Sequence, residues 1–274
     1  MARIHNILDF SSKKSSGTKI SVVTCYDYTS ALMVAASNID CVLVGDSVAM
    51  TMHGAASTIS ATVQQMAMHT EWVIRGLKDG TKAADKTPFV IADLPFLSYR
   101  KDRSANVDAA LTIMQAGANA IKIEGAKGNL ALIEHLVDSG VPVMGHLGLT
   151  PQSVNQIGGY KVQGKTPEAH QAMLDDAKAL EVAGCFGMVL ECVPALLARE
   201  ISSQVQIVTI GIGAGNETDG QVLVWQDLLG LNTQFKPKFV RRYFDGFGEF
   251  QKALNHYHAD VLGQTFPSEV ESFK

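Results

Sequence analysis

Short apolar segments alternate along the chain, from Ile20 onward, with longer segments in which apolar residues recur at helical spacing. The short segments are typical of buried strands, and their alternation with helices predicts parallel strands joined by crossover helices. The expected strands are Ile20–Cys25, Cys41–Val44, Phe89–Ala92, Ala120–Gly125, Val141–His146, Phe186–Leu190, Ile207–Ile210 and Val222–Trp225. The last segment fits the start of a helix equally well. Eight strands in 274 residues favour an α/β fold, a single (β/α)8 TIM barrel, over an open doubly wound sheet.

Helices are expected where apolar residues follow the spacing of one buried face. One runs from near Thr29 to before Asn38, one carries the face Val63, Met66, Ala67, Thr70, Ile74 and Leu77, one runs from about Pro167 to Ala183, and a C-terminal helix covers Lys238–Gly263. We therefore expect one catalytic domain over residues 1–274, with a short N-terminal extension at about residues 1–19 and an irregular C-terminal tail.

The expected strand Ala120–Gly125 carries two charges inside an apolar run. Alternate side chains of a strand share a face, so Lys122 and Glu124 lie on one side while Ile121 and Ile123 lie on the other. The isoleucines suit the side covered by helices, which turns the two charges toward the inside of the barrel. Buried charges are costly unless they are paired, so other strands must supply partners.

Those partners are expected at the C-terminal ends of neighbouring strands. Asp46, Asp93, Glu124, His146 and Glu191 follow or end five successive expected strands. A single aspartate in such a place is more often a helix cap or a turn residue. Five in succession, at the barrel face where active sites are built, predict a functional site.

The residue types at these ends suggest a cation site. Asp46, Asp93 and Glu124 would bring three carboxylates together, and their hard oxygen atoms suit Mg²⁺ better than Zn²⁺. Lys122 either holds an anionic substrate group or forms an ion pair with a neighbouring carboxylate, and the sequence favours neither. Glu191, at the end of another apolar run, is a candidate general base. A metal, a lysine and a separate base fit enolate chemistry on an α-keto acid.

Composition narrows the class of protein. The net charge is -4 and lysine and arginine form no extended cluster, so we expect no nucleic-acid partner. No apolar run approaches the ~20 residues of a membrane helix, and the polar N-terminus lacks a signal-peptide core, so we expect a cytoplasmic protein that does not enter a membrane. The 4 cysteines, with no Cys-x-x-Cys spacing, are expected to be free thiols. The glycine-rich run at residues 211–215 fits a phosphate cradle and a tight turn equally well.

Several motifs near the strand ends occur together in this chain. They are Thr24-Cys25-Tyr26-Asp27, Val44-Gly45-Asp46-Ser47, Ala92-Asp93-Leu94-Pro95-Phe96, Lys122-Ile123-Glu124-Gly125, the block from Pro142 to Ser153, Gly159-Tyr160-Lys161-Val162-Gln163-Gly164, Leu190-Glu191-Cys192-Val193-Pro194 and Ile210-Gly211-Ile212-Gly213-Ala214-Gly215. With Asp219-Gly220-Gln221 and the region at Pro237, they extend over nearly all of residues 20–273. In these motifs the chain resembles the ketopantoate hydroxymethyltransferase (3-methyl-2-oxobutanoate hydroxymethyltransferase) family.

The resemblance implies a (β/α)8 barrel that transfers a hydroxymethyl group from 5,10-methylenetetrahydrofolate to α-ketoisovalerate, giving ketopantoate in the biosynthesis of pantothenate. It also implies residue roles. Asp46, Asp93 and Glu124 would bind Mg²⁺ directly or through water; Asp46, Ser47, Asp93 and Lys122 would contact the keto acid; Glu191 would accept the proton, and His146 would support the site. The family further implies a large homo-oligomer, commonly a decamer.

Two other classes fit parts of this pattern. One is a Mg²⁺-dependent barrel enzyme of the phosphoenolpyruvate mutase or isocitrate lyase type, but the chain has no Lys-Lys-Cys-Gly-His signature of the lyase. The other is a barrel that binds ligands without catalysis, which should have lost a charged strand-end residue. The chain departs from the family pattern at Gln226 and Glu271, where histidine is usual; both lie outside the proposed metal and base residues.

Overall fold

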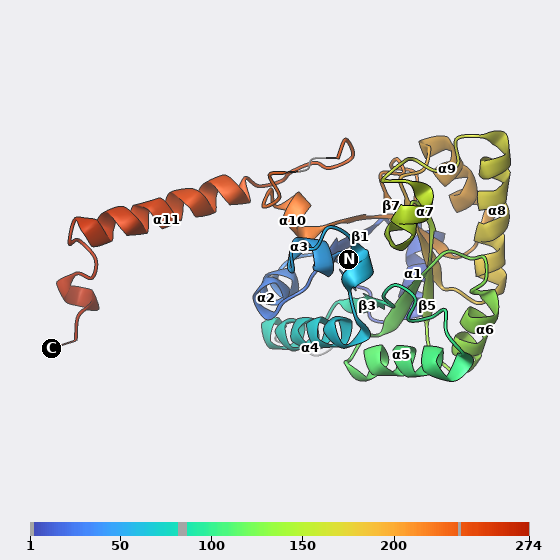
Figure 1. The fold of residues 1–274 in the computed structure, drawn as a ribbon, viewed down its shortest axis with the longest axis horizontal. Helices are drawn as coiled ribbons and strands as arrows, with labels where there is room; N and C mark the ends of the chain where they lie inside the picture. The colour runs from blue at the N-terminus through green and yellow to red at the C-terminus, as the bar shows by residue number, and fades with distance from the viewer. Residues whose placement is uncertain (1–2, 82–86, 235–236, 274) are drawn as a thin grey trace. The chain divides into compact units, whose positions relative to one another are not determined.

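Eight parallel strands form a closed barrel in sequence order in this computed structural model, which describes residues 3–81, 87–234 and 237–273 (Figure 1). They are β1 (Ile20–Thr24), β2 (Cys41–Val44), β3 (Phe89–Asp93), β4 (Ala120–Glu124), β5 (Val143–Gly148), β6 (Gly187–Glu191), β7 (Val208–Ile212) and β8 (Gly220–Leu223). Parallel pairing of β8 with β1, with Gly220 opposite Ile20, closes the sheet. The predicted (β/α)8 barrel is confirmed.

Strand boundaries differ from expectation mainly at the C-terminal ends. β5, β6 and β7 continue to Gly148, Glu191 and Ile212, because Glu191 pairs with both neighbouring strands. The glycines there resemble turn residues in sequence. The expected strand at Val222–Trp225 was wrong in its bounds, since β8 ends at Leu223 and Trp225 begins a short helix.

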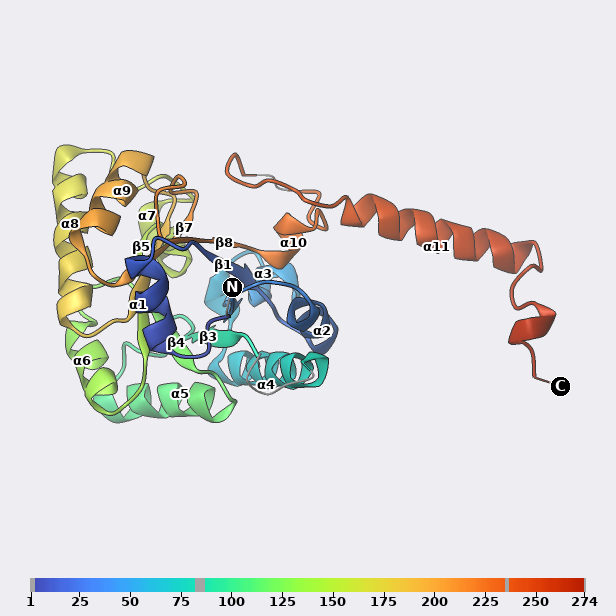
Figure 2. The same cartoon turned by 180° about the vertical axis from the view of Figure 1, so that it is seen from behind.

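The longer helices between residues 28 and 204 lie around the outer side of the sheet (Figures 1 and 2). The helical segments are α1 (Ile7–Ser15), α2 (Tyr28–Ala36), α3 (Val48–Thr51), η1 (Thr58–Ser60), α4 (Val63–Gly80), α5 (Arg103–Gln115), α6 (Leu130–Asp138), η3 (Pro151–Ser153), α7 (Val154–Ile157), α8 (Pro167–Val182), α9 (Ala195–Gln204), α10 (Trp225–Leu228), α11 (Gly246–Leu262) and η4 (Glu269–Glu271). α4 begins with a capping box between Thr62 and Gln65 and buries Met66, Val73 and Leu77.

The N-terminal segment contains helix α1, which the sequence pattern did not indicate (Figure 2). Asn6 caps it, and Phe10 is its buried aromatic residue. The ring centroid of Phe10 lies 5.4 Å from that of Phe89 and 5.0 Å from that of Phe186, near the starts of β3 and β6. The helix therefore packs over the N-terminal end of the barrel, opposite the ends that carry the expected site.

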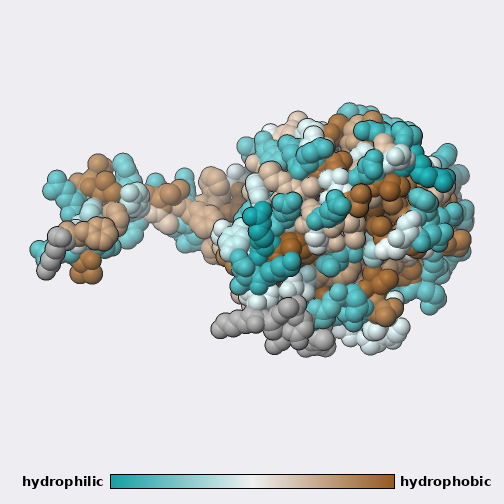
Figure 3. Space-filling view, turned by 90° about the horizontal axis from the view of Figure 1, so that it is seen from below, coloured by the Kyte–Doolittle hydropathy of each residue, from teal (hydrophilic) through white to brown (hydrophobic). Residues whose placement is uncertain are grey.

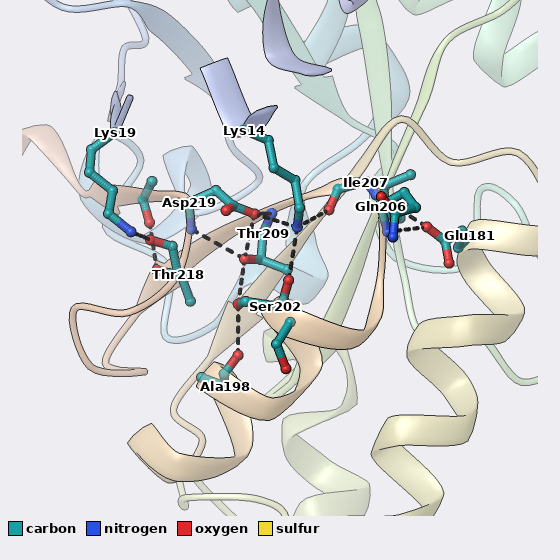
Figure 4. A network of polar contacts seen from close by, with 12 residues as sticks. Lys14, Lys19, Glu181, Ala198, Ser202, Gln206, Ile207, Thr209, Thr218 and Asp219 are labelled. Atoms are coloured by element: carbon teal, nitrogen blue, oxygen red, sulfur yellow. Dashed lines mark hydrogen bonds and ion pairs between the residues drawn. The ribbon is translucent and has the colours of Figure 1, made fainter. Parts of the chain in front are cut away.

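No helix joins β7 to β8, because the fully described residues 213–219 form an irregular loop. Hydrogen bonds and an ion pair made by side chains connect this loop to the rest of the barrel (Figure 4). Lys14 Nζ donates to two backbone carbonyl oxygens at 3.0 and 2.8 Å and pairs with Asp219 Oδ2 at 2.9 Å. Asp219 Oδ2 also accepts hydrogen bonds from the backbone N–H and the hydroxyl of Thr209, at 2.8 and 3.0 Å. Helix α1 is thus tied to both final strands.

Two glycines of the loop after β7 have positive φ. Gly213 and Gly215 have φ of 63° and 80°, a backbone conformation that residues other than glycine rarely adopt. A Cβ atom on Gly215 would also lie 2.6 Å from that of Ala195, at the start of α9. Backbone conformation and close packing account for these glycines.

The chain divides into two compact units, one ending at Leu223 and the other beginning at Val224. In the second unit, α11 begins at Gly246, so the expected helix start at Lys238 was wrong; the Asp245 side chain caps it. Apolar side chains reach the surface of this unit (Figure 3). Those on α11 are Phe247, Phe250, Leu254, Tyr257, Val261 and Leu262. Among the helices of the described residues, none is both long and apolar enough to span a bilayer.

Candidate active site

The barrel interior has an apolar floor below the predicted site. Val22, Leu43, Ile91, Met144, Val189, Ile210 and Val222 are buried together there. Charges placed above such a layer are poorly solvated, so their interactions are stronger than they would be in water.

Strand register brings the charged residues together above this floor. Asp93 on β3 lies opposite Lys122 on β4, and Glu124 on β4 lies opposite His146 on β5. All four side chains are buried. Ala120, on the same face of β4 as Lys122 and Glu124, belongs to the apolar core inside the barrel, so the inward orientation expected for the two charges is confirmed. Asp46, just after β2, is buried with them.

Lys122 is the central cation of the group. Its Nζ lies 3.0 Å from Asp93 Oδ1 and 3.9 Å from Glu124 Oε1. Burial alone would lower the pKa of Lys122, but the surrounding carboxylates, Asp93 first, outweigh it and hold that pKa above its usual range. The side chain is therefore a buried ammonium at neutral pH.

The negative charge of the group exceeds what Lys122 compensates. Burial, followed by repulsion from Asp93 and Glu124, raises the pKa of Asp46 well above its usual range. Burial also raises the pKa of Asp93, against the attraction of Lys122. For Glu124 burial acts in the same sense, but His146 and Lys122 outweigh it and lower the pKa. Asp46 thus has the least compensation for its charge, and a further cation beside it would stabilise its ionised form.

The donor set fits a hard divalent cation. Asp46 and Asp93 are adjacent, since the backbone N–H of Asp46 donates to Asp93 Oδ2 at 2.9 Å. The Oδ1 of Asp93 is paired with Lys122 Nζ at 3.0 Å, so a cation at Asp93 would share this carboxylate with the lysine. Within the described ranges, no three or more His, Cys, Asp and Glu side chains are arranged to hold a metal ion by themselves. This arrangement fits Mg²⁺, which is commonly held by one or two carboxylates together with water and substrate oxygens.

His146 lies between two glutamates of different strands. Its Nδ1 is 3.5 Å from Glu124 Oε1, and its Nε2 is 3.3 Å from Glu191 Oε2. Burial and Lys122, whose Nζ is 3.2 Å from Nδ1, oppose protonation of the ring. The two glutamates outweigh them and raise the pKa of His146 to about 9. The ring of His146 therefore lies between Glu191 and the buried carboxylates, within 3.5 Å of both glutamates.

Glu191 stands at the mouth of the site, with a side chain 17% exposed where those of Lys122, Glu124 and His146 are 3% exposed. The next residue, Cys192, has φ of 48°, in the left-handed region that is strained for cysteine. Its N–H donates to Ile212 O at 2.9 Å, and its carbonyl accepts the N–H of Gln163 at 2.9 Å. Hydrogen bonds on both sides thus hold the backbone that carries Glu191.

One protein-family model matches nearly the full length of the chain. Residues 5–269 match the family model described as ketopantoate hydroxymethyltransferase.

The chain belongs to the ketopantoate hydroxymethyltransferase family.

Relatives named 3-methyl-2-oxobutanoate hydroxymethyltransferase support this membership. The protein from Bdellovibrio bacteriovorus is 58% identical over 267 residues, covering 97% of this chain and 98% of the relative. The protein from Legionella pneumophila (strain Paris) is 53% identical, covering 97% and 99%. The chain is accordingly a transferase, and the resemblance drawn from its motifs is confirmed.

Solved structures of other proteins share the barrel of this hydroxymethyltransferase family member. A putative phosphonomutase from Burkholderia cenocepacia J2315 has a TM-score of 0.61 at 14% identity and covers 93% of this chain and 98% of its own. Phosphonopyruvate hydrolase in complex with oxalate and Mg++ has a TM-score of 0.61 at 9% identity, covering 98% and 93%. At sequence identities this low, the structural similarity shows a shared fold and nothing about activity.

In this hydroxymethyltransferase fold, the predicted site residues of β2 to β6 lie together. Ser47 lies beside Asp46, with its Oγ 2.8 Å from the hydroxyl of the buried Tyr26. Sequence reasoning gave no role to Tyr26, Tyr99 or Gln152. All three belong to motifs or loops at the C-terminal face of the barrel, and that location is the signal that points to them.

Proposed function

We propose that the chain catalyses the Mg²⁺-dependent transfer of a hydroxymethyl group from 5,10-methylenetetrahydrofolate to α-ketoisovalerate, giving ketopantoate for the pantothenate pathway. The observation that carries the proposal is the excess of buried carboxylate over ammonium around Lys122, at the mouth of a barrel from this family. A site of that charge suits a divalent cation and an anionic keto acid together.

Asp46 and Asp93 would hold Mg²⁺, with Glu124 acting directly or through water. When bound, the ion supplies a Lewis acid for the keto oxygen of the substrate. Lys122 contributes a fixed positive charge for the substrate, and the hydroxyl of Ser47 offers a hydrogen bond beside it. The apolar floor beneath these groups keeps water away from the substrate's lower side.

Glu191 is the proposed proton acceptor. It is the partly exposed carboxylate of the group, and its Oε2 lies 3.3 Å from His146 Nε2. Removal of the C3 proton of α-ketoisovalerate leaves its electron pair as an enolate. Water adds to the methylene carbon of the folate as its two C–N bonds break, which releases tetrahydrofolate and leaves a one-carbon aldehyde. C3 of the enolate then bonds to this carbon, and the aldehyde oxygen takes up a proton to become the hydroxyl group.

We also infer that the enzyme is a homo-oligomer of the cytoplasm. Support for the oligomer comes from the apolar side chains of α11, which buries only Gly246 within the described chain, and a decamer is expected from the family. Support for a reducing compartment comes from the cysteines, all of which are free thiols.

The direct test follows exchange of the C3 proton of α-ketoisovalerate with deuterium from solvent, with and without Mg²⁺ and without folate. Exchange that requires the enzyme and Mg²⁺, followed by ketopantoate formation when the folate is added, is the expected result. A metal-replete preparation that gives neither exchange nor ketopantoate would overturn the proposal.

A further inference from the structure

We infer that Gln152 is a positioning residue, locked by Tyr99, that holds Asp46 and Glu124 in the arrangement the cation requires. This inference rests on the proposed function for the identity of the cation. Gln152 lies in η3, the short helix in the loop after β5, and touches no reacting atom in the mechanism above.

The side chain and backbone of Gln152 reach two different carboxylates. Its Nε2 donates to Asp46 Oδ2 at 2.8 Å, and its backbone N–H donates to Glu124 Oε2 at 3.1 Å. Gln152 and both carboxylates are buried, so water does not compete for these bonds. One residue of the β5 loop therefore fixes an oxygen at the end of β2 and another at the end of β4.

The orientation of the Gln152 amide is determined by its other partners. Its Nε2 is 3.0 Å from the backbone oxygen of Leu94, which can only accept a hydrogen bond, so the nitrogen must lie on that side. The amide oxygen then faces the Tyr99 hydroxyl at 2.6 Å, and the hydroxyl must donate. A flipped amide would place its oxygen against both the Leu94 oxygen and Asp46. The network therefore has one direction, from Tyr99 through Gln152 to Asp46.

This fixed direction matters because the buried carboxylates of Asp46 and Glu124 repel each other. Without fixed donors, the two carboxylates would turn apart until a cation arrived, and binding would include the cost of bringing them back. Donors that are already aligned remove much of this reorganisation. Loss of a residue that orients metal ligands commonly weakens metal affinity about 10–100-fold.

The test compares three variants of the full-length enzyme. Gln152→Met keeps the length of the side chain and removes its hydrogen bonds, while Tyr99→Phe removes only the hydroxyl. Asn106→Leu is the matched control, because Asn106 is a buried amide on α5 whose side chain bonds to the backbone of Lys101. Each protein is titrated with Mg²⁺ in two ways: by the rise in Tm, and by the rate of deuterium exchange into α-ketoisovalerate.

We expect Gln152→Met to raise the Mg²⁺ concentration at half-maximal effect about 10–100-fold in both titrations. Tyr99→Phe should raise it in the same direction by a smaller factor, and Asn106→Leu should lower the metal-free Tm without changing the Mg²⁺ requirement. If Gln152→Met does not fold, Tyr99→Phe alone decides the matter.

A Mg²⁺ requirement within twofold of wild type in Gln152→Met, or in Tyr99→Phe where that variant decides, would overturn the positioning role. An equal change in Asn106→Leu would also overturn it. Wild-type enzyme that shows neither a Mg²⁺-dependent Tm nor exchange would instead refute the proposed function, so the two failures are distinguishable.

Discussion

Glu124 and His146 are register partners on neighbouring parallel strands, with Glu124 Oε1 3.5 Å from His146 Nδ1. The backbone pairing of β4 with β5 therefore fixes their contact. Because the other ring nitrogen of His146 approaches Glu191, the strand register also sets the distance between the proposed base and the carboxylates. The proposed base and the proposed cation ligands are thus held by neighbouring strands of one sheet.

The Glu191→Gln substitution should separate these two activities. The glutamine side chain keeps the size of the glutamate but cannot accept a proton, so exchange at C3 of α-ketoisovalerate should fall by about 10²–10⁴-fold. Mg²⁺-dependent binding of the keto acid, measured by calorimetry, should persist. Exchange at the wild-type rate would show that another group is the base.

Replacing Lys122 with methionine should destabilise the barrel and make it more dependent on Mg²⁺. Removing one partner of a buried charge group commonly costs about 3–5 kcal/mol, because the remaining carboxylates lose their compensation. Urea unfolding should show this loss at neutral pH and a partial recovery when Mg²⁺ is added.

The control for that variant is Lys252→Met, since the Lys252 side chain is exposed on α11 and pairs with Glu249 at 2.7 Å. Exposed pairs contribute little to the free energy of unfolding, so no comparable loss is expected. A Lys122→Met protein as stable as Lys252→Met, with or without Mg²⁺, would contradict the prediction.

Stability should depend on pH through Asp40, which pairs with Lys13 of α1 at 2.8 Å. Burial opposes ionisation of Asp40, but Lys13 and the hydrogen bonds from Ser21 outweigh it and lower its pKa below the usual 3.8. A lowered folded-state pKa stabilises the fold above the unfolded value, and this contribution is lost as pH falls through the folded value.

Wild type and Asp40→Asn should therefore differ in free energy of unfolding by about 1 kcal/mol at pH ~7. The difference should shrink as the pH falls below 3.8. Denaturant unfolding across this range provides the measurement, and a difference that stays constant down to acid pH would refute the role of the charge.

Phe10→Ala should lower the free energy of unfolding by about 3–5 kcal/mol, because it removes the ring that packs against Phe89 and Phe186 and leaves a cavity. Leu8→Ala is the control on the same helix, since Leu8 is 71% exposed. Equal effects of the two substitutions on the Tm would show that α1 does not seal the barrel.

The barrel and most of the charged site could be predicted because both follow from local pattern. Apolar strands that end in charged residues are visible in the sequence, and a closed barrel brings their ends together. Helix α1 was missed because one large apolar residue, Phe10, carries most of its buried contact, which leaves little periodicity to detect. The start of α11 was placed too early because apolar and charged residues at 238–245 resemble its own pattern.

The role of Gln152 could not be predicted for a different reason. Its place at the C-terminal face of the barrel marks Gln152 as a site residue, but its partner Asp46 is 106 residues away in sequence, so no sequence pattern pairs the two. Only the path of the loop after β5 brings the two together. The carboxylates could be found from the sequence, whereas the groups that orient them required the structure.

The ion pair between Lys14 and Asp219 joins residues 205 positions apart. During synthesis, α1 leaves the ribosome first, yet Asp219 and Thr209, at the other end of the Lys14 network, are made near the end. The N-terminal helix must therefore wait for almost the whole barrel before it gains these contacts, so its docking is a late step in folding. The ion pair that ties α1 to the barrel can therefore form only after the loop between β7 and β8 has been synthesised.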